Sequence, residues 1–143
     1  MTMSLTFSYY YGKLYQTKSF HYIINKMKIS EIKDILKAEV FAGNDNLDKS
    51  VVAAGGSDMM DDIKLALAEG SVLLTGDTSG QVIQTARVAG VVAVVFVRGK
   101  KPDKHIVDLA QSYGIPVLLT GCSMFVASGR LYINGLRGLD GSC

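Results

Sequence analysis

Hydrophobic residues follow two different spacings along residues 27–131. Uninterrupted apolar runs at residues 72–74, 91–97 and 117–119 are each bounded by glycine, proline or polar residues. Runs of this kind are typical of strands that are buried on both faces of a sheet. Between the runs, hydrophobic residues recur every three or four positions, as in residues 106–113, which is typical of helices with one buried face. The pattern therefore predicts strands that alternate with helices.

These predicted elements fill most of the chain after residue 26. The predicted strands cover residues 39–42, 51–54, 72–74, 91–97 and 117–119, and the predicted helices begin near residues 30, 57, 78, 102 and 123. The helix near residue 78 is predicted from Thr78-Ser-Gly-Gln81, which has the spacing of a capping box. Strands that alternate with helices pair in parallel through right-handed crossovers. We predict a three-layer α/β/α domain with a mostly parallel sheet of four to five strands.

The composition changes at Met27, and this change divides the chain into parts. Five of the seven tyrosines precede Met27, whereas all 13 acidic residues follow it. We predict an extension with little part in the core over residues 1–26, the α/β domain over residues 27–134, and a flexible tail over residues 135–143, which hold three glycines. An alternative for residues 1–26 is a short aromatic arm that mediates pairing between chains.

The charge, the cysteine content and the lengths of the apolar runs argue against several classes of protein. Residues 27–143 carry 12 basic and 13 acidic residues, which is not the basic surface expected of a nucleic-acid-binding protein. The two cysteines, Cys122 and Cys143, cannot form a disulfide framework, and no Cys/His spacing suits a metal site. The longest apolar run, residues 91–97, is far shorter than the roughly 20 residues that cross a bilayer. We expect a cytoplasmic protein without a metal site.

Candidate binding residues follow the predicted strands. Ligands of open parallel sheets bind outside the carboxyl ends of the strands, and free N–H groups at helix starts favour an anion. In this sequence the strand ends combine glycine with small polar or charged residues. The candidate site residues for a nucleotide or a small anionic metabolite are Asp77, Thr78, Ser79, Gly80, Arg98 and Thr120. An alternative is that these residues serve only as caps and turns, with the Asp77 carboxylate itself occupying the donors.

Sharper chemical signatures are missing from the sequence. Neither a P-loop nor a G-x-G-x-x-G fingerprint is present, so we predict no cofactor. Cys122 lies between a predicted strand and a predicted helix, a position that reactive cysteines occupy in some enzymes. The histidines, His21 in the extension and His105 on a helix, are not obvious base partners for it. A small thiol enzyme that uses Cys122 stays open as an alternative.

Several motifs between residues 27 and 132 together resemble the DRTGG domain family. They are Met27-Lys-Ile-Ser-Glu-Ile32, Lys37-Ala-Glu-Val-Phe41, Ser71-Val-Leu-Leu-Thr-Gly76, Val94-Val-Phe-Val-Arg-Gly99, Gly114-Ile-Pro-Val-Leu118 and Ser123-Met-Phe125. Asp77-Thr-Ser-Gly-Gln81 corresponds to the name-giving segment and matches it only at Asp77 and Gly80. The resemblance implies a fold similar to the amino-terminal domain of HPr kinase. Such domains occur beside CBS domains in regulated pyrophosphatases, within some phosphotransacetylases and as short stand-alone proteins.

The resemblance implies a regulatory or assembly module that is not an enzyme. We therefore expect a stand-alone regulatory domain that forms a homodimer and binds a nucleotide or a small anionic metabolite, with no nucleic-acid or membrane partner. An alternative is a purely structural module that docks on a larger partner enzyme.

Overall fold

The computed structural model describes residues 26–66 and 69–139. Its strands are β1 (Met27–Lys28), β2 (Glu39–Ala42), β3 (Ser50–Val51), β4 (Ala53–Gly56), β5 (Ser71–Thr75), β6 (Ala93–Phe96) and β7 (Val117–Leu119). Its helices are α2 (Ile29–Leu36), the 3₁₀ turn η1 (Asn44–Asn46), α3 (Met60–Ala66), α4 (Gln81–Ala89), α5 (Lys104–Tyr113) and α6 (Met124–Ile133). The predicted extension lies outside the described residues, apart from Lys26.

Five strands form one sheet in the order β2-β7-β6-β5-β4. The four strands from β7 to β4 pair in parallel, and β2 pairs antiparallel with β7 at one edge. A separate pair, β1 and β3, is antiparallel. The predicted mostly parallel sheet of four to five strands is confirmed.

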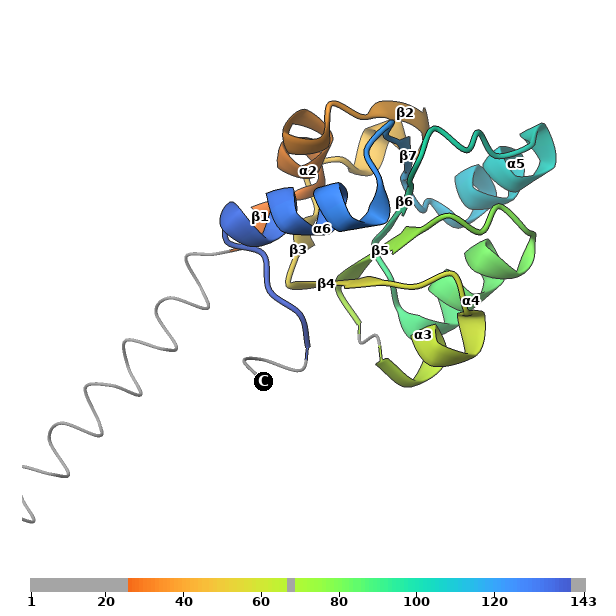
Figure 1. Ribbon diagram of the computed structural model, residues 1–143. Helices are drawn as coiled ribbons and strands as arrows, with labels where there is room; N and C mark the ends of the chain where they lie inside the picture. The colour runs from red at the N-terminus through yellow and green to blue at the C-terminus, as the bar shows by residue number, and fades with distance from the viewer. Residues whose placement is uncertain (1–25, 67–68, 140–143) are drawn as a thin grey trace, which may run out of the picture.

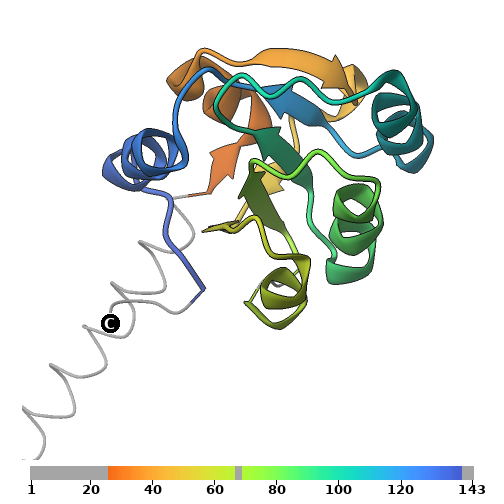
Figure 2. The ribbon, with the colours of Figure 1, turned by 45° about the vertical axis from the view of Figure 1, so that its right-hand side comes forward.

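Helices cover both faces of this sheet, as Figures 1 and 2 show. Successive residues of a strand point to opposite faces, so Leu74 and Val95 pack with α2 and α6, whereas Leu73 and Phe96 pack with α3, α4 and α5. The central strands are therefore buried on both faces, which explains their uninterrupted apolar sequences. The predicted three-layer α/β/α architecture is confirmed.

The first two predicted strands are not partners in a hairpin. The strands predicted at residues 39–42 and 51–54 are neighbours in the sequence, but β2 and β4 lie at opposite edges of the five-stranded sheet. The stretch predicted as one strand over residues 51–54 is divided between β3 and β4. β2 pairs instead with β7, 75 or more residues later in the chain, so no local pattern could indicate this pairing.

Residues 135–137, at the start of the tail predicted over residues 135–143, make contacts with the domain. Leu136 is only 2% exposed and belongs to the core on the α6 side of the sheet. The backbone carbonyl of Arg137 accepts a hydrogen bond of 2.9 Å from the N–H of Ala54 in β4. The tail thus covers part of the free edge of β4, because an apolar side chain and a backbone acceptor both find partners there.

Leu136→Ala tests this packing. We expect the free energy of unfolding to fall by about 2–4 kcal/mol, because a fully buried leucine loses its contacts and leaves a cavity. Urea denaturation measures the change. The matched control is Leu139→Ala, three residues further along and 43% exposed, for which we expect a change within about 0.5 kcal/mol. Equal, small effects of both substitutions would contradict the packing of the tail.

Candidate functional site

Four loops meet at the carboxyl edge of the parallel strands. They are residues 57–59 after β4, 76–80 after β5, 97–103 after β6 and 120–123 after β7. Because β4 to β7 run in the same direction, their carboxyl ends lie at one edge of the sheet (Figure 2). The structure thus brings together all the loops that carry the predicted site residues.

The Asp58 carboxylate connects its own loop to two of the other loops at this edge. Its Oδ1 accepts a 2.6 Å hydrogen bond from the backbone N–H of Gly76, and its Oδ2 lies 3.3 Å from Nη2 of Arg98. The Gly76 N–H, followed by the positive charge of Arg98, lowers the pKa of Asp58, although partial burial opposes the shift. The ionised carboxylate therefore acts as an internal anion that holds loop 76–80 and Arg98 together.

Arg98 is held by its backbone in a left-handed conformation with φ of 60°. Its N–H donates to the carbonyl of Cys122 at 2.8 Å, and the N–H of Gly99 donates to the carbonyl of Thr120 at 2.9 Å. The left-handed region is uncommon for a residue with a side chain, and surrounding hydrogen bonds must maintain it. This conformation links the loop after β6 to the loop after β7.

Gly76 leaves the space that the Arg98 guanidinium occupies. A Cβ atom at position 76 would collide with Nη2 of Arg98 and would also crowd Asp58. The guanidinium therefore lies against the backbone of Gly76, and the Arg98 side chain stays 45% exposed. One side of the cation faces Asp58, while the remaining surface is open to solvent or to a ligand.

Asp77 closes the loop in which it lies. Its carboxylate accepts from the backbone N–H of Ser79 at 2.8 Å and from the Ser79 hydroxyl at 3.1 Å. The predicted capping box is wrong: α4 begins at Gln81 with Gly80 in the cap position, and no side chain caps the helix. Asp77 thus occupies the Ser79 donor, as the alternative interpretation anticipated, whereas Thr78 and Gly80 lie half-buried beside it.

Thr120 has a different environment from the other candidates. Its side chain is buried, and its hydroxyl donates to the carbonyl of Leu36 at 2.8 Å and accepts from the N–H of Cys122 at 3.2 Å. It therefore ties loop 120–123 to the end of α2. Cys122 follows it, and the Sγ of Cys122 lies 3.5 Å from Nη1 of Arg130 in α6.

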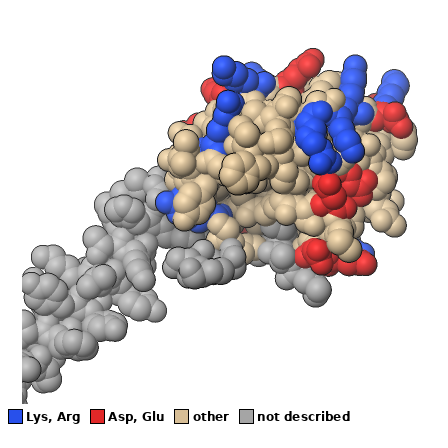
Figure 3. Space-filling view, in the orientation of Figure 1, with Lys and Arg blue, Asp and Glu red and all other residues tan. Residues whose placement is uncertain are grey.

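Basic residues surround the edge at Arg98. Lys100 is close enough to contribute to the lowered pKa of Asp58, and the Lys101 ammonium lies 5.5 Å from the centroid of the Phe41 ring. Figure 3 shows Lys and Arg side chains gathered beside acidic ones next to the loops that lead into α4 and α5. The loop after β6 therefore presents a local excess of positive charge, which attracts anions.

Asp58 is the site residue that sequence reasoning missed. It lies in one of the four strand-end loops that the sequence indicates, two residues after Gly56. However, its partners are 18 and 40 residues away. An acidic residue that follows a parallel strand, with a basic residue following another strand of the sheet, is the signal that could have identified it.

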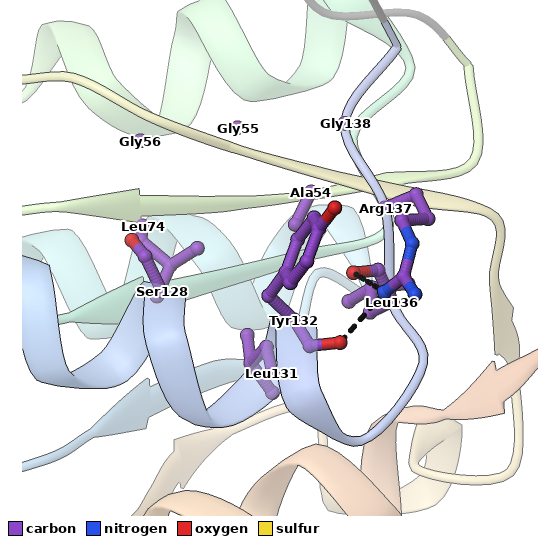
Figure 4. Close-up of a pocket in the computed structure, with 10 residues that line it drawn as sticks. All are labelled: Ala54, Gly55, Gly56, Leu74, Ser128, Leu131, Tyr132, Leu136, Arg137 and Gly138. Carbon is purple, nitrogen blue, oxygen red and sulfur yellow. Dashed lines mark hydrogen bonds between the residues drawn. The ribbon is translucent and has the colours of Figure 1, made fainter. Parts of the chain in front are cut away.

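A cavity of about 120 Å³ lies between β4, α6 and the residues that follow α6. It is lined by Gly55, Gly56, Leu131, Tyr132 and Arg137 among others. Figure 4 shows the Tyr132 ring and the Arg137 side chain at its wall, with Arg137 donating to the carbonyls of Tyr132 and Leu136. This cavity contains none of the predicted site residues.

A metal-binding cluster and a membrane-spanning helix are both absent from the described part of the chain. Within residues 26–66 and 69–139, no three His, Cys, Asp or Glu side chains lie together in a way that could hold a metal ion. Over the same residues, no helix has the length and apolar character needed to cross a membrane.

The comparisons with known proteins identify the class. The model of the DRTGG domain matches residues 31–132, so the chain belongs to the DRTGG domain family. The predicted family is confirmed. Among the curated proteins, none matches the sequence.

One similar solved structure contains the CBS and DRTGG domains of the regulatory region of Clostridium perfringens pyrophosphatase, in complex with its activator diadenosine tetraphosphate. The match has a TM-score of 0.63 and 24% sequence identity. It covers 77% of this chain and 47% of the other chain. The chain therefore spans about half of the length of that regulatory region, and the likeness establishes the fold.

Asp58→Asn tests the role of the internal anion. The folded-state pKa of Asp58 is lowered, so the stabilisation is present above the unfolded value of about 4 and is lost as the pH falls through the folded value. We expect the variant to be less stable than the wild type by about 1 kcal/mol at pH 7, a value reduced by solvent screening of the half-exposed pair. The difference should disappear toward pH 2 in urea denaturation series.

The control is Asp45→Asn. Asp45 lies in η1, which follows β2. Because β2 runs antiparallel to the other four strands, η1 lies at the opposite end of the strands from their carboxyl edge. We expect this variant to follow the wild-type pH profile. A constant deficit for Asp58→Asn at all pH values would show that its carboxylate charge does not stabilise the loops.

Proposed function

We propose that this chain is a non-catalytic regulatory domain that binds a nucleotide or another small anionic metabolite at the carboxyl edge of its sheet. The observation that carries the proposal is the Arg98 guanidinium, which lies against Gly76 and Asp58 with 45% of its side chain exposed. A fixed, half-exposed guanidinium suits a phosphate because its planar donors match phosphate geometry.

The remaining contacts would come from loop 76–80. The backbone N–H groups of Thr78 and Gly80 precede the start of α4, and the hydroxyls of Thr78 and Ser79 lie in the same loop. Donors at a helix start favour an anion. Asp77 keeps this loop in one conformation through Ser79, and Thr120 positions the neighbouring loop from within the core.

The ligand would act by changing the pairing of Arg98. In the structure Asp58 is its acidic partner, and a bound phosphate would share or replace that interaction. Because Asp58 also holds the Gly76 N–H, ligand binding would change the relative stability of two loop arrangements. A ligand that prefers one arrangement shifts the population toward it, which is the regulatory effect proposed.

The comparisons support the ligand class. The similar regulatory region of the pyrophosphatase is described with diadenosine tetraphosphate as its activator. We therefore propose an adenine nucleotide as the first ligand to test, a homodimer as the assembly, and a larger enzyme as a regulated partner in the cytoplasm. A purely structural docking module is the second candidate, and it differs in that it would have no ligand dependence.

An enzyme based on Cys122 has less support. Its Sγ contacts Arg130, whereas His105, the histidine of the described residues, is exposed on α5. A nucleophilic cysteine needs a base within hydrogen-bond reach. His21 lies outside the described residues.

Calorimetric titration of the full chain with ATP, diadenosine tetraphosphate and acetyl phosphate tests the proposal. We expect at least one of them to bind with a Kd below about 1 mM. Arg98→Gln should weaken this binding about tenfold or more, because a charge-assisted contact to phosphate is lost.

The control is Lys49→Gln, which removes one positive charge before β3. We expect it to leave the Kd nearly unchanged, since Lys49 lies away from the four loops. Absence of binding by all three ligands, together with an unchanged Tm in their presence, would refute the ligand-binding part. Equal weakening by both variants would show that general charge, not Arg98, is responsible.

A further inference from the structure

The outer face of α6 is apolar and exposed. Phe125 is 86% exposed and Ile133 is 81% exposed, and Tyr132 and Val126 are exposed beside them. The opposite face of the same helix, at Ala127 and Leu131, is buried in the core. Here the exposed face is called the α6 face, and it consists of Phe125, Val126, Ser128, Gly129, Tyr132 and Ile133.

The α6 face has the size of the largest apolar patch of a typical monomer, and such patches are often functional. Its large apolar residues together expose on the order of 500 Å², within the range of about 300–600 Å² for the largest apolar patch of a typical monomer. A standard interface buries about 800 Å² on each partner. The patch would therefore supply the greater part of one side of a modest interface. None of its six residues is charged, so charge does not oppose the approach of a like surface.

Gly129 at the centre of this face is not explained by the fold of one chain. It lies inside the helix, and a Cβ atom added there would meet nothing within 4 Å. Glycine destabilises the interior of a helix relative to alanine. The close approach of another helix is a physical reason for a residue without a side chain at this position.

The spacing along α6 matches a second copy of itself. Phe125 and Ile133 are each four residues from Gly129, so all three lie on one face of the helix. In an antiparallel pair with a twofold axis at Gly129, Phe125 of each copy would face Ile133 of the other. A surface that complements itself in this way is what an isologous dimer interface requires.

We infer that the α6 face is the homodimer interface, with two antiparallel α6 helices crossing at Gly129. This inference deepens the self-association in the proposed function and rests on it. The cavity of about 120 Å³ beside Tyr132 lies next to this face, and its walls include Ser128 and Leu131 from α6.

Sedimentation equilibrium of the full chain over a range of concentrations tests the inference, with two variants of opposite chemistry. Phe125→Glu places a charge on the α6 face at the position that would face Ile133 of the second copy. Gly129→Leu adds apolar surface but keeps the helices apart, and the open space at Gly129 means that the fold of one chain tolerates it. We expect each variant to raise the dimer dissociation constant about 30-fold or more.

The matched control is Val88→Glu. Val88 is 84% exposed on α4, on the opposite face of the sheet, and we expect its substitution to leave the dissociation constant within about twofold of wild type. Circular dichroism of all variants verifies that they fold. Gly129→Leu is the diagnostic variant, because non-specific hydrophobic association would become stronger with the added leucine.

Three outcomes would overturn the inference. A wild-type dimer that persists in both α6 variants would leave self-association intact but refute this interface. A dimer weakened as much by Val88→Glu as by Phe125→Glu would do the same. A full chain that stays monomeric would refute the self-association, and with it a second copy of the chain as the partner at the α6 face. This holds whether or not a chain without residues 1–25 forms dimers. None of these results would decide whether the chain binds a ligand, which calorimetry measures separately.

Discussion

The parallel register of β4 to β7 determines what this domain can do, because it brings four loops distant in sequence to one edge. Asp58 then connects two of these loops to its own through Gly76 and Arg98. The interaction is electrostatic and partly exposed, so it is modest in energy. It nevertheless fixes where the Arg98 guanidinium lies, and the candidate site depends on that position.

The candidate site and the α6 face are connected by one short loop. The Arg98 N–H donates to the carbonyl of Cys122, and the next residue, Ser123, caps α6 through its hydroxyl. A change in the position of Arg98 would therefore reach the start of α6 through a single hydrogen bond. A regulatory domain needs such a connection, because a ligand can influence a partner only when its binding favours one of two arrangements at the contact surface.

The sequence predicted the strands better than the site. The strand at residues 117–119 was predicted with its observed bounds, since burial on both faces imposes a continuous apolar run. The position of the candidate site at the carboxyl edge of the strands was also predictable, because it follows from their parallel pairing. The Asp58–Arg98 pair was not predictable in this way, as its members are 40 residues apart. Nor could local sequence show that Thr120 bonds to Leu36, a contact across 84 residues, or that the tail at Leu136 is anchored in the core.

The central claim is that a phosphate-bearing ligand binds at the carboxyl edge beside Arg98. A nitrogen–proton NMR correlation spectrum of the full chain, recorded as ATP or diadenosine tetraphosphate is added, tests it most directly. We expect the largest shifts on the backbone amides of Gly76, Ser79, Arg98 and Cys122, with small shifts in η1 at the opposite end of the strands. Shifts confined to η1 and the neighbouring strands, with these four amides unmoved, would contradict it.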